Sequence, residues 1–330
     1  MSGVELVSVK AEEADQRLDR WLRRRFPGLT QGRIEKLLRK GEIRLDGKRV
    51  DGKARVFSGQ VVRLPPNIEK AVVPKAGPAA VSEADARFVR GLVIHEDQDV
   101  IVINKPPGLA VQGGTGQGRH LDAMLGALAN AEGERPRLVH RLDLDTSGVM
   151  VLGRNVRATA QLAAAFRSKA ARKTYWALVA GVPDPAQGRI DMALAKSGGP
   201  AGERVAQDEE DGKRAVTLYV TVDHALERCA WLAMRPITGR THQLRVHAAV
   251  ALGTPVVGDT KYGGQRALLA TDAVKPMLHL HARALTLPHP AGGTLRAVAP
   301  LPAHMRETWK FFGFDLDADT DPLFEPKGRR

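Results

Sequence analysis

A stretch rich in proline and alanine interrupts the chain between residues 65 and 85, with the sequence PPNIEKAVVPKAGPAAVSEAD. It follows neither the period of a helix nor that of a strand, and each proline removes a backbone N–H donor. Such a composition favours a linker between two separately folded parts. We therefore expect a small domain over residues 1–64, a linker over 65–85, a large domain over 86–312 and a C-terminal tail over 313–330.

Positive charge is concentrated in the small domain. Between Gln16 and Val50 there are 12 Lys and Arg against 4 Asp and Glu, a net +8 out of the +13 of all 330 residues. A basic surface of this kind binds polyanions through phosphate attraction and counterion release. Nucleic acid is therefore the leading class of partner, ahead of an anionic membrane surface. The plainer interpretation is that these charges only solvate a helical face.

Apolar residues of the same segment predict two short amphipathic helices. The i, i+3, i+4 spacing that buries one face of a helix occurs twice, at Leu18, Trp21 and Leu22 and at Ile34, Leu37 and Leu38. Asp46-Gly47 accepts the positive φ angles of a tight turn, which predicts a hairpin between residues 43–45 and 48–50. The small domain should therefore be helix, helix, hairpin.

The string QRLDRWLRRRFPGLTQGRIEKLLRKGEIRLDGKRV, which spans these elements, resembles the S4 RNA-binding domain. Thr30-Gln31-Gly32 departs from the Ser-Arg-Ser that commonly opens the second helix of that family. The resemblance implies a small α+β domain whose basic side chains contact structured RNA. The candidate RNA-binding residues are Arg17, Arg20, Arg33, Lys36, Arg39, Lys40, Lys48 and Arg49.

The large domain alternates short apolar runs with helical patterns. Strands are expected at 92–94, 100–103, 149–152, 174–179, 217–222 and 229–234, and helices at 121–128, 156–167 and 241–252. A long polar insertion begins at residue 196, and we expect it to be mobile. Hairpins mixed with helices in this order favour an α+β fold with a mixed, largely antiparallel sheet over a doubly wound fold.

Two features that the sequence lacks indicate where in the cell the protein works. Cys229 is the single cysteine, so no internal disulfide can form and a reducing compartment is expected. The N-terminal sequence MSGVELVSVKAEEADQ lacks the apolar region of a signal peptide, and no run of about 18 apolar residues occurs. We therefore expect a cytoplasmic protein that does not span a membrane.

The most informative stretch is LVHRLDLDTSGVMVLGRN, from Leu138 to Asn155. Its polar residues, from His140 to Ser147, lie between apolar runs, which is typical of a site loop held by rigid structure. From polarity alone, a capped turn in which an aspartate binds backbone amides is an equal alternative. The full string HRLDxxTSG, however, resembles the signature loop of the RluA-type pseudouridine synthases. That family's essential aspartate maps to Asp143.

Other segments resemble the same family in the same order. ARKTYWALVAG contains the Lys-x-Tyr-x-Ala pattern at Lys173, Tyr175 and Ala177, Gly239 opens the Gly-Arg-Thr-His-Gln motif, and LHLHARALTLPHP matches the closing element. Four long motifs in register are far more specific than any one of them. NKPPGLAVQGGTG together with the S4-like domain places the chain closest to the RluC type, which acts on large-subunit ribosomal RNA. Gln112 departs from the histidine frequent in that subgroup.

The resemblance implies that the chain converts uridine in RNA to pseudouridine, which needs no cofactor or energy source. Asp143 would be the nucleophile, as a carboxylate is in a retaining glycosidase, although whether it attacks C1′ or C6 stays open. Arg245 would be the cation that keeps this carboxylate charged. Tyr175 would stack on the base, with proton transfer a second role, and Arg141 would fill the space that a flipped base leaves. The further candidates for substrate contacts are Arg240, His242 and Gln243.

Three other functions remain to be weighed. Asp143 and Asp145 face the same way on an extended segment and could hold magnesium for phosphodiester cleavage, which EDTA would abolish. No HExxH pattern occurs, since His242 and His247 are five apart, and we predict no metal site. A non-catalytic S4-type ribosome-binding factor would need no pair formed by Asp143 and Arg245. A transfer-RNA pseudouridine synthase is the third alternative.

The expected partner is RNA, namely 23S ribosomal RNA or a large-subunit assembly intermediate, and the expected state is a monomer. Side chains alone do not encode which uridines are modified, because RNA shape and flanking bases decide this.

Overall fold

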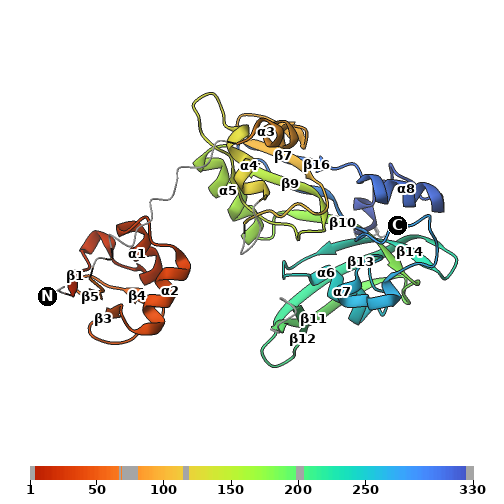
Figure 1. Cartoon of the computed structure of the whole chain (residues 1–330). Coiled ribbons are helices and arrows are strands. Elements are labelled where there is room, and N and C mark those ends of the chain that lie inside the picture. The colour runs from red at the N-terminus through yellow and green to blue at the C-terminus, as the bar shows by residue number, and fades with distance from the viewer. Residues whose placement is uncertain (1–3, 67, 69–80, 114–118, 198–203, 325–330) are drawn as a thin grey trace. The chain divides into compact units, whose positions relative to one another are not determined.

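The computed structural model describes residues 4–66, 68, 81–113, 119–197 and 204–324 (Figure 1). The chain forms two compact units, Met1–Ala79 and Ala80–Arg330. Within the described residues, none of the helices has the length and apolar character needed to cross a membrane.

The predicted linker is wrong at both of its ends. Ile68 is 2% exposed and belongs to the core of the first unit. The second unit opens with helix α3 (Glu83–Arg90), whose first turn is capped by the Ser82 hydroxyl accepting from the Asp85 amide. A segment without helical or strand periodicity can still contain a buried apolar residue, here Ile68, or a helix-capping serine, here Ser82. The expected range 65–85 was therefore too long. Residues 67 and 69–80 lie outside the described residues.

The first unit contains the two predicted helices, α1 (Leu18–Arg25) and α2 (Gln31–Lys40). A three-stranded antiparallel sheet accompanies them, in the order β1 (Glu5–Ser8), β5 (Val61–Leu64), β3 (Arg44–Leu45). A separate pair joins β2 (Gln16–Arg17) to β4 (Arg55–Val56). The apolar faces of both helices meet one core around Trp21.

The predicted hairpin of the first unit is half correct. Asp46 and Gly47 have the expected positive φ values, 47° and 74°. However, Lys48 forms only an isolated bridge to Leu45, and β3 pairs with β5. The Asp46 carboxylate accepts from the Val61 amide at 2.8 Å, so the turn is bonded to a more distant strand.

The second unit is built on one 11-stranded, largely antiparallel sheet, as the sequence predicted. Its central order is β12-β11-β13-β14-β10-β15-β9-β7-β6, with β16 paired to β15 and β8 to β9. Among the described pairs of strands, the parallel pair joins β15 to the start of β9. The strands are β6 (Val93–Glu96), β7 (Val100–Lys105), β8 (Arg137–Leu138), β9 (Ser147–Gly153), β10 (Arg172–Ala180), β11 (Gln187–Ser197), β12 (Arg204–Gln207), β13 (Lys213–Ala225), β14 (Cys229–Pro236), β15 (Leu280–Pro288) and β16 (Thr294–Val298).

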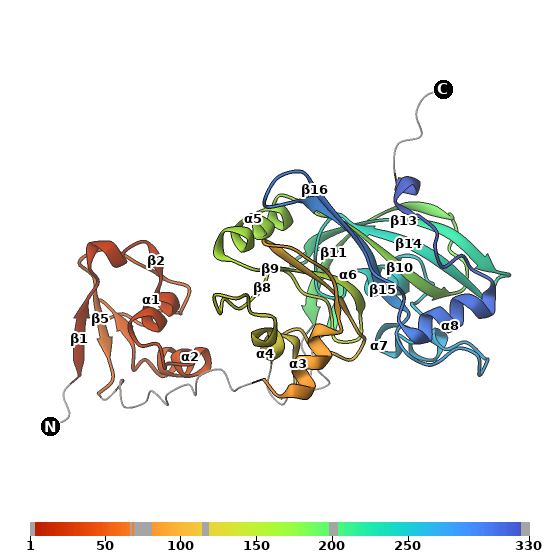
Figure 2. The same ribbon diagram turned by 90° about the horizontal axis from the view of Figure 1, so that it is seen from above.

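Helices cover both faces of this sheet because its strands are apolar on both sides. On β7, Ile101 and Ile103 pack with α3, whereas Val100 and Val102 face α5. Figure 2 shows α5 on one side of β7 and β9, with α3 and α4 on the other. In Figure 1, α8 lies on one side of the other half of the sheet, and α6 and α7 on the opposite side. The helices are α4 (Leu121–Met124), α5 (Val156–Arg167), α6 (Gln243–Val246), α7 (Thr260–Gly263) and α8 (Ala303–Phe312).

The polar insertion and the C-terminal tail are both more ordered than the sequence indicated. Residues 204–207 form β12, which pairs with β11, while 198–203 lie outside the described residues. In the expected tail, Phe314 is buried and the Arg283 guanidinium donates to the Leu316 carbonyl. The Thr320 hydroxyl accepts from the Trp176 indole at 2.9 Å. The described part of the expected tail, up to residue 324, is therefore bonded to the second unit, and scattered polar residues concealed these contacts in the sequence.

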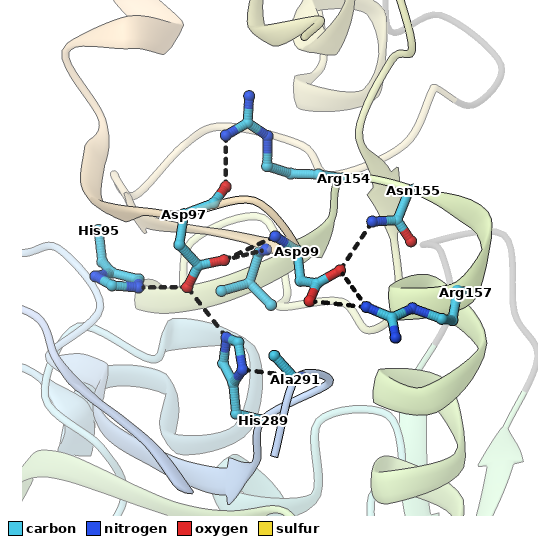
Figure 3. A network of polar contacts seen from close by, with 9 residues as sticks. His95, Asp97, Asp99, Arg154, Asn155, Arg157, His289 and Ala291 are labelled. Atoms are coloured by element: carbon cyan, nitrogen blue, oxygen red, sulfur yellow. Dashed lines mark hydrogen bonds and ion pairs between the residues drawn. The ribbon is translucent and has the colours of Figure 1, made fainter. Parts of the chain in front are cut away.

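A polar network joins the beginning of the second unit to its closing motif (Figure 3). The Asp97 carboxylate accepts from the backbone amides of Asp99 and Val100 and lies 3.0 and 3.1 Å from the Nε2 atoms of His95 and His289. Burial alone would raise the pKa of Asp97, but these hydrogen bonds lower it to about 2. A charged Asp97 thereby fastens the loop after β15 to the turn between β6 and β7.

Candidate active site

One pocket of about 680 Å³ lies in the second unit and collects all seven predicted site residues. It is lined by the loop before β9, the start of β10, the end of β14 and the residues around the start of α6. The predicted residues in its wall are Arg141, Asp143, Tyr175, Arg240, His242, Gln243 and Arg245.

Two of the predicted motifs contact each other directly and hold the Asp143 loop. Gly148 has a φ of 115°, and a Cβ there would lie 2.3 Å from the Ala282 carbonyl oxygen of β15. Beside it, Ser147 Oγ lies 2.8 Å from His281 Nδ1, while His281 Nε2 lies 3.2 Å from the Ala299 carbonyl. Because the carbonyl can only accept, the ring donates from Nε2 and Nδ1 accepts from the serine hydroxyl. The glycine and this hydrogen bond bring β9 against β15 directly after the loop.

Lys105 anchors the same loop and was not singled out by sequence reasoning. Its side chain is fully buried at the end of β7, and its Nζ donates to the carbonyls of Pro106, Leu109 and Leu144, each at 2.9 Å. Burial lowers the pKa of Lys105 to about 8, although the carboxylates of Asp145 and Asp143 oppose this shift. The signal available in the sequence was a lysine ending the apolar run VIVINK.

Asp143 lies at the pocket wall with its side chain 22% exposed. The Oδ2 atom of Asp143 is 3.9 Å from Nε2 of His242, and Nδ1 of that ring is 2.6 Å from the Tyr262 hydroxyl. The Tyr262 oxygen also accepts from the Val205 amide, so the His242 ring is held between Tyr262 and Asp143. Burial lowers the pKa of His242, so the neutral form of the ring is favoured.

Arg245 does not form the direct ion pair with Asp143 that the sequence predicted. Its guanidinium forms a bidentate pair with Asp259, at 2.8 and 2.6 Å, and it also lies 5.2 Å from the ring centre of Tyr262. Burial alone would lower the pKa of Arg245, but Asp259 and, more weakly, Asp143 raise it overall. Asp143 therefore feels the field of Arg245 from outside hydrogen-bonding distance. Asp259, which holds this cation, was missed because it lies 14 residues away in a separate loop.

The helix expected over 241–252 begins two residues later and is irregular. His242 adopts a left-handed conformation, with φ 51°, before α6, and residues His247–Ala251 continue as a π-helical turn. Both features are uncommon and concentrate at functional sites. The left-handed conformation helps to set His242 between Asp143 and Tyr262.

Gln243, a predicted substrate contact, lines the pocket with its amide bonded to the protein. Its side chain is buried and makes four hydrogen bonds, donating to the Val216 carbonyl and the Thr217 hydroxyl and accepting from the Thr238 hydroxyl and the Arg240 amide. These saturate the amide group. Gln243 therefore fixes the loop at 238–240 against β13.

Tyr175 lies where a β-bulge interrupts the pairing of β10 with β15. It packs against both the apolar cluster around α3 and the one around α6, so it spans the junction between the two halves of the sheet. Burial, assisted by the charge of Asp143, raises the pKa of Tyr175 well above the usual tyrosine value. The phenol stays protonated near neutral pH, which favours stacking over acting as a base.

The other polar residues of the pocket differ in exposure and in hydrogen bonding. His140 accepts from the Val151 amide at 3.0 Å and stacks on Phe166, and burial together with Lys173 lowers its pKa to about 3. It is therefore a neutral structural ring. Arg141 and Arg240 are exposed at the pocket, and Arg240 donates to the Arg214 carbonyl.

In the first unit, the side chains predicted to bind RNA are exposed, as a contact surface requires. Arg17 is bonded to Asp19, and Lys40 lies 3.7 Å from Glu42. The eight exposed residues are Arg17, Arg20, Arg33, Lys36, Arg39, Lys40, Lys48 and Arg49.

Comparison with known proteins agrees with both units. A family model described as RNA pseudouridylate synthase matches residues 99–250, and the S4 domain model matches residues 16–62. Curated relatives named ribosomal large subunit pseudouridine synthase C include that of Rickettsia bellii, 36% identical over 82% of this chain and 89% of the relative. The Escherichia coli K12 relative of the same name is 35% identical over 90% of this chain and 93% of its own length.

A solved structure of human RNA Pseudouridylate Synthase Domain Containing 4 superposes with a TM-score of 0.59. It is 29% identical and covers 71% of this chain and 97% of its own. The chain therefore belongs to the RNA pseudouridylate synthase family and carries an S4 domain. It is an isomerase that converts uridine to pseudouridine, and RNA is its partner.

Proposed function

We propose that this protein isomerises specific uridines of large-subunit, 23S ribosomal RNA, with Asp143 as the nucleophile. The observation that carries this proposal is the charge of the pocket. Among its described lining residues, Asp143 is the only carboxylate, and it faces a wall that contains eight lysines and arginines. Such a pocket suits an anionic RNA strand and leaves one acid to react with the nucleoside.

The groups around Asp143 suit the reaction. The N1–C1′ bond breaks, the base turns, C5–C1′ forms and the C5 proton leaves. A carboxylate can support this either by adding to the nucleoside or by stabilising positive charge at the sugar. The side chain of this carboxylate is 22% exposed, its Oδ2 atom lies 3.9 Å from the His242 ring nitrogen, and the charge of Arg245 is near enough to interact with it.

The same geometry gives the neighbouring residues distinct roles. Tyr175 offers a neutral aromatic face on which the flipped base stacks. Arg141, exposed beside Asp143, is suited to fill the gap left in the RNA helix. Arg240 is suited to phosphate contact. We extend the proposal, as the sequence predicted, to a monomer acting in the cytoplasm on 23S ribosomal RNA or a large-subunit assembly intermediate.

Asp143→Asn tests the proposal. The amide keeps the shape of the side chain but is a poor nucleophile, so turnover should fall by more than about a thousandfold while RNA affinity stays within about threefold. Tritium release from 5-tritiated uridine in ribosomal RNA measures the first quantity and filter binding the second. Pseudouridine mapping of ribosomal and transfer RNA from a deletion strain identifies the target.

Asp145→Asn is the matched control, since Asp145 is an exposed carboxylate two residues away and absent from the pocket wall. It should retain turnover. Normal turnover by Asp143→Asn would end the assignment of the nucleophile. Loss of pseudouridine from transfer RNA alone, in the deletion strain, would show that transfer RNA and not ribosomal RNA is the substrate.

A further inference from the structure

Lys173 differs from the two buried cations of the pocket, Arg235 and Arg245, in having no partner among the described residues. Arg245 is paired with Asp259 and Arg235 with Asp321, and the Arg240 guanidinium donates to a carbonyl. Within the described part of the chain, Lys173 makes neither an ion pair nor a hydrogen bond, although it lines the pocket and is half-buried.

The ammonium group of Lys173 lies in the pocket wall, close to two of the loops that carry site residues. Lys173 and Tyr175 are two residues apart on β10 and therefore lie on the same face of the sheet. Nζ of Lys173 stands 3.9 Å from where a Cβ on Gly239 would lie, beside the loop that leads to His242. Its charge also helps to lower the pKa of His140, so the ammonium lies between the Asp143 loop and the loop around Gly239.

A half-buried ammonium without a counter-ion is costly, because desolvation disfavours its charge. Burial does lower the pKa of Lys173, and the Asp143 carboxylate has no part in that shift. No carboxylate of the described residues lies within ion-pair distance of Lys173, so the position is open to an anion that enters with a ligand. An RNA strand supplies one phosphate per nucleotide, and flipping a base draws the phosphates on either side of it to the mouth of the pocket.

We propose that Lys173 binds a phosphodiester group directly adjacent to the flipped uridine, and so positions that nucleotide against Asp143 and Tyr175. This inference rests on the proposed approach of the target uridine to Asp143. Lys173 is a substrate-binding residue in this scheme, distinct from the exposed arginines at the rim, because its ammonium is set back in the wall and reaches only the strand at the reacting nucleotide.

The experiment combines a protein change with a neutral phosphate. The probe is a synthetic RNA stem-loop carrying a uridine whose modification is lost in the deletion strain, with a methylphosphonate at one linkage at a time around that uridine. Full-length wild-type protein, Lys173→Met and Lys173→Arg are compared by kcat/KM. Lys310→Met, an exposed lysine on α8, is the matched control, and thermal unfolding checks that each variant is folded.

On unmodified RNA, Lys173→Met should lose about ten- to a hundredfold in kcat/KM, as expected for a charge-assisted hydrogen bond, and Lys173→Arg should recover most of it. A methylphosphonate at one linkage beside the uridine should weaken the wild type by a similar factor and leave Lys173→Met unchanged. Lys310→Met should behave as the wild type throughout.

Two outcomes would overturn the inference. If the methylphosphonate effects and the Lys173→Met effect multiply at every linkage, the lysine contacts no phosphate and acts elsewhere, for instance on a base carbonyl. If Lys173→Met matches the wild type on unmodified RNA, the ammonium is a bystander. The proposed function fails separately, namely when the wild type itself releases no tritium from the unmodified stem-loop.

Discussion

The two units of the chain use positive charge in opposite ways. In the first, the eight cations predicted to bind RNA stand exposed around one small core built by α1 and α2. In the second, two cations near Asp143 are withdrawn from water, since Lys105 is bonded to three carbonyls and Arg245 to Asp259. The exposed charges can attract RNA over a distance, whereas these two buried charges hold the loops around a single carboxylate.

The largest effect is expected from removing the ion pair between Arg245 and Asp259. Arg245→Met leaves Asp259 charged, with its side chain fully buried, and should cost about 3 to 5 kcal/mol in the free energy of unfolding. It should also cut kcat by about a hundredfold near neutral pH, because Asp143 loses the field that favours its charged form. Denaturant unfolding and tritium release measure the two effects.

The double variant Arg245→Met/Asp259→Asn separates fold from chemistry. Asparagine can keep the cap that Asp259 provides to the Tyr262 amide while it removes the unpaired charge, so stability should largely return. Activity should stay low. Full activity in the double variant would show that Arg245 acts only as the partner of Asp259, and Asp259→Asn alone is the control.

Acid should unfold the second unit before the first. Burial lowers the pKa of His140 and His281 to about 3 and that of His247 and His279 to about 4. Between these values and about 6.5 the unfolded chain binds protons that the native chain does not, so the free energy of unfolding falls as the pH falls. Each histidine contributes a slope of at most about 1.4 kcal/mol per pH unit.

The first unit contains no histidine, so its stability should be flat down to about pH 5, below which its carboxylates with lowered pKa values, Glu13 and Asp19, also begin to matter. Calorimetry of the full chain from about pH 7 to about pH 5 should show one transition moving and one staying. His247→Gln should lessen the slope of the moving transition, and His224→Gln, at an exposed position, should not. Two transitions that move together would mean that the units do not unfold independently.

The smallest effect on activity is expected from removing the exposed charges of the first unit. Deleting residues 1–79 should leave a folded catalytic unit that modifies fewer ribosomal sites, or modifies them more slowly. The slope of log affinity against log salt should flatten by about 0.7 to 0.9 for each phosphate contact that is lost. Filter binding between about 50 and 200 mM KCl measures this slope.

The paired variant Arg20→Gln/Lys36→Gln should reproduce part of that change in the full chain, while Lys53→Gln, exposed but outside the predicted set, should not. If the slope of log affinity against log salt stayed unchanged and activity stayed full, the basic residues of the two helices would be surface charges that do not contact RNA. Insoluble truncated protein would show that the two units share a core.

The prediction of the fold succeeded where the signal is local. The strands over residues 149–152 and 229–234 and helix α5 lie where alternation and helical spacing placed them. The predictions failed where a distant partner decides the structure, as for β3, which leaves its own turn to pair with β5, and for the tail that bonds to Trp176. Local periodicity reports which face of an element is buried but not which element covers it.

By itself, the sequence determined the family and the two-part organisation and singled out Asp143 as the candidate nucleophile, because a long signature string and a run of exposed charges are local properties. Only the tertiary structure decided that Arg245 is held by Asp259, that Gln243 is a brace and that Lys173 faces the pocket unpaired. The physical reason is that the energy of a charge depends on its burial and on its nearest partner. In this pocket those partners come from strands and loops far apart in the chain, so sheet order, which no local pattern encodes, sets the chemistry.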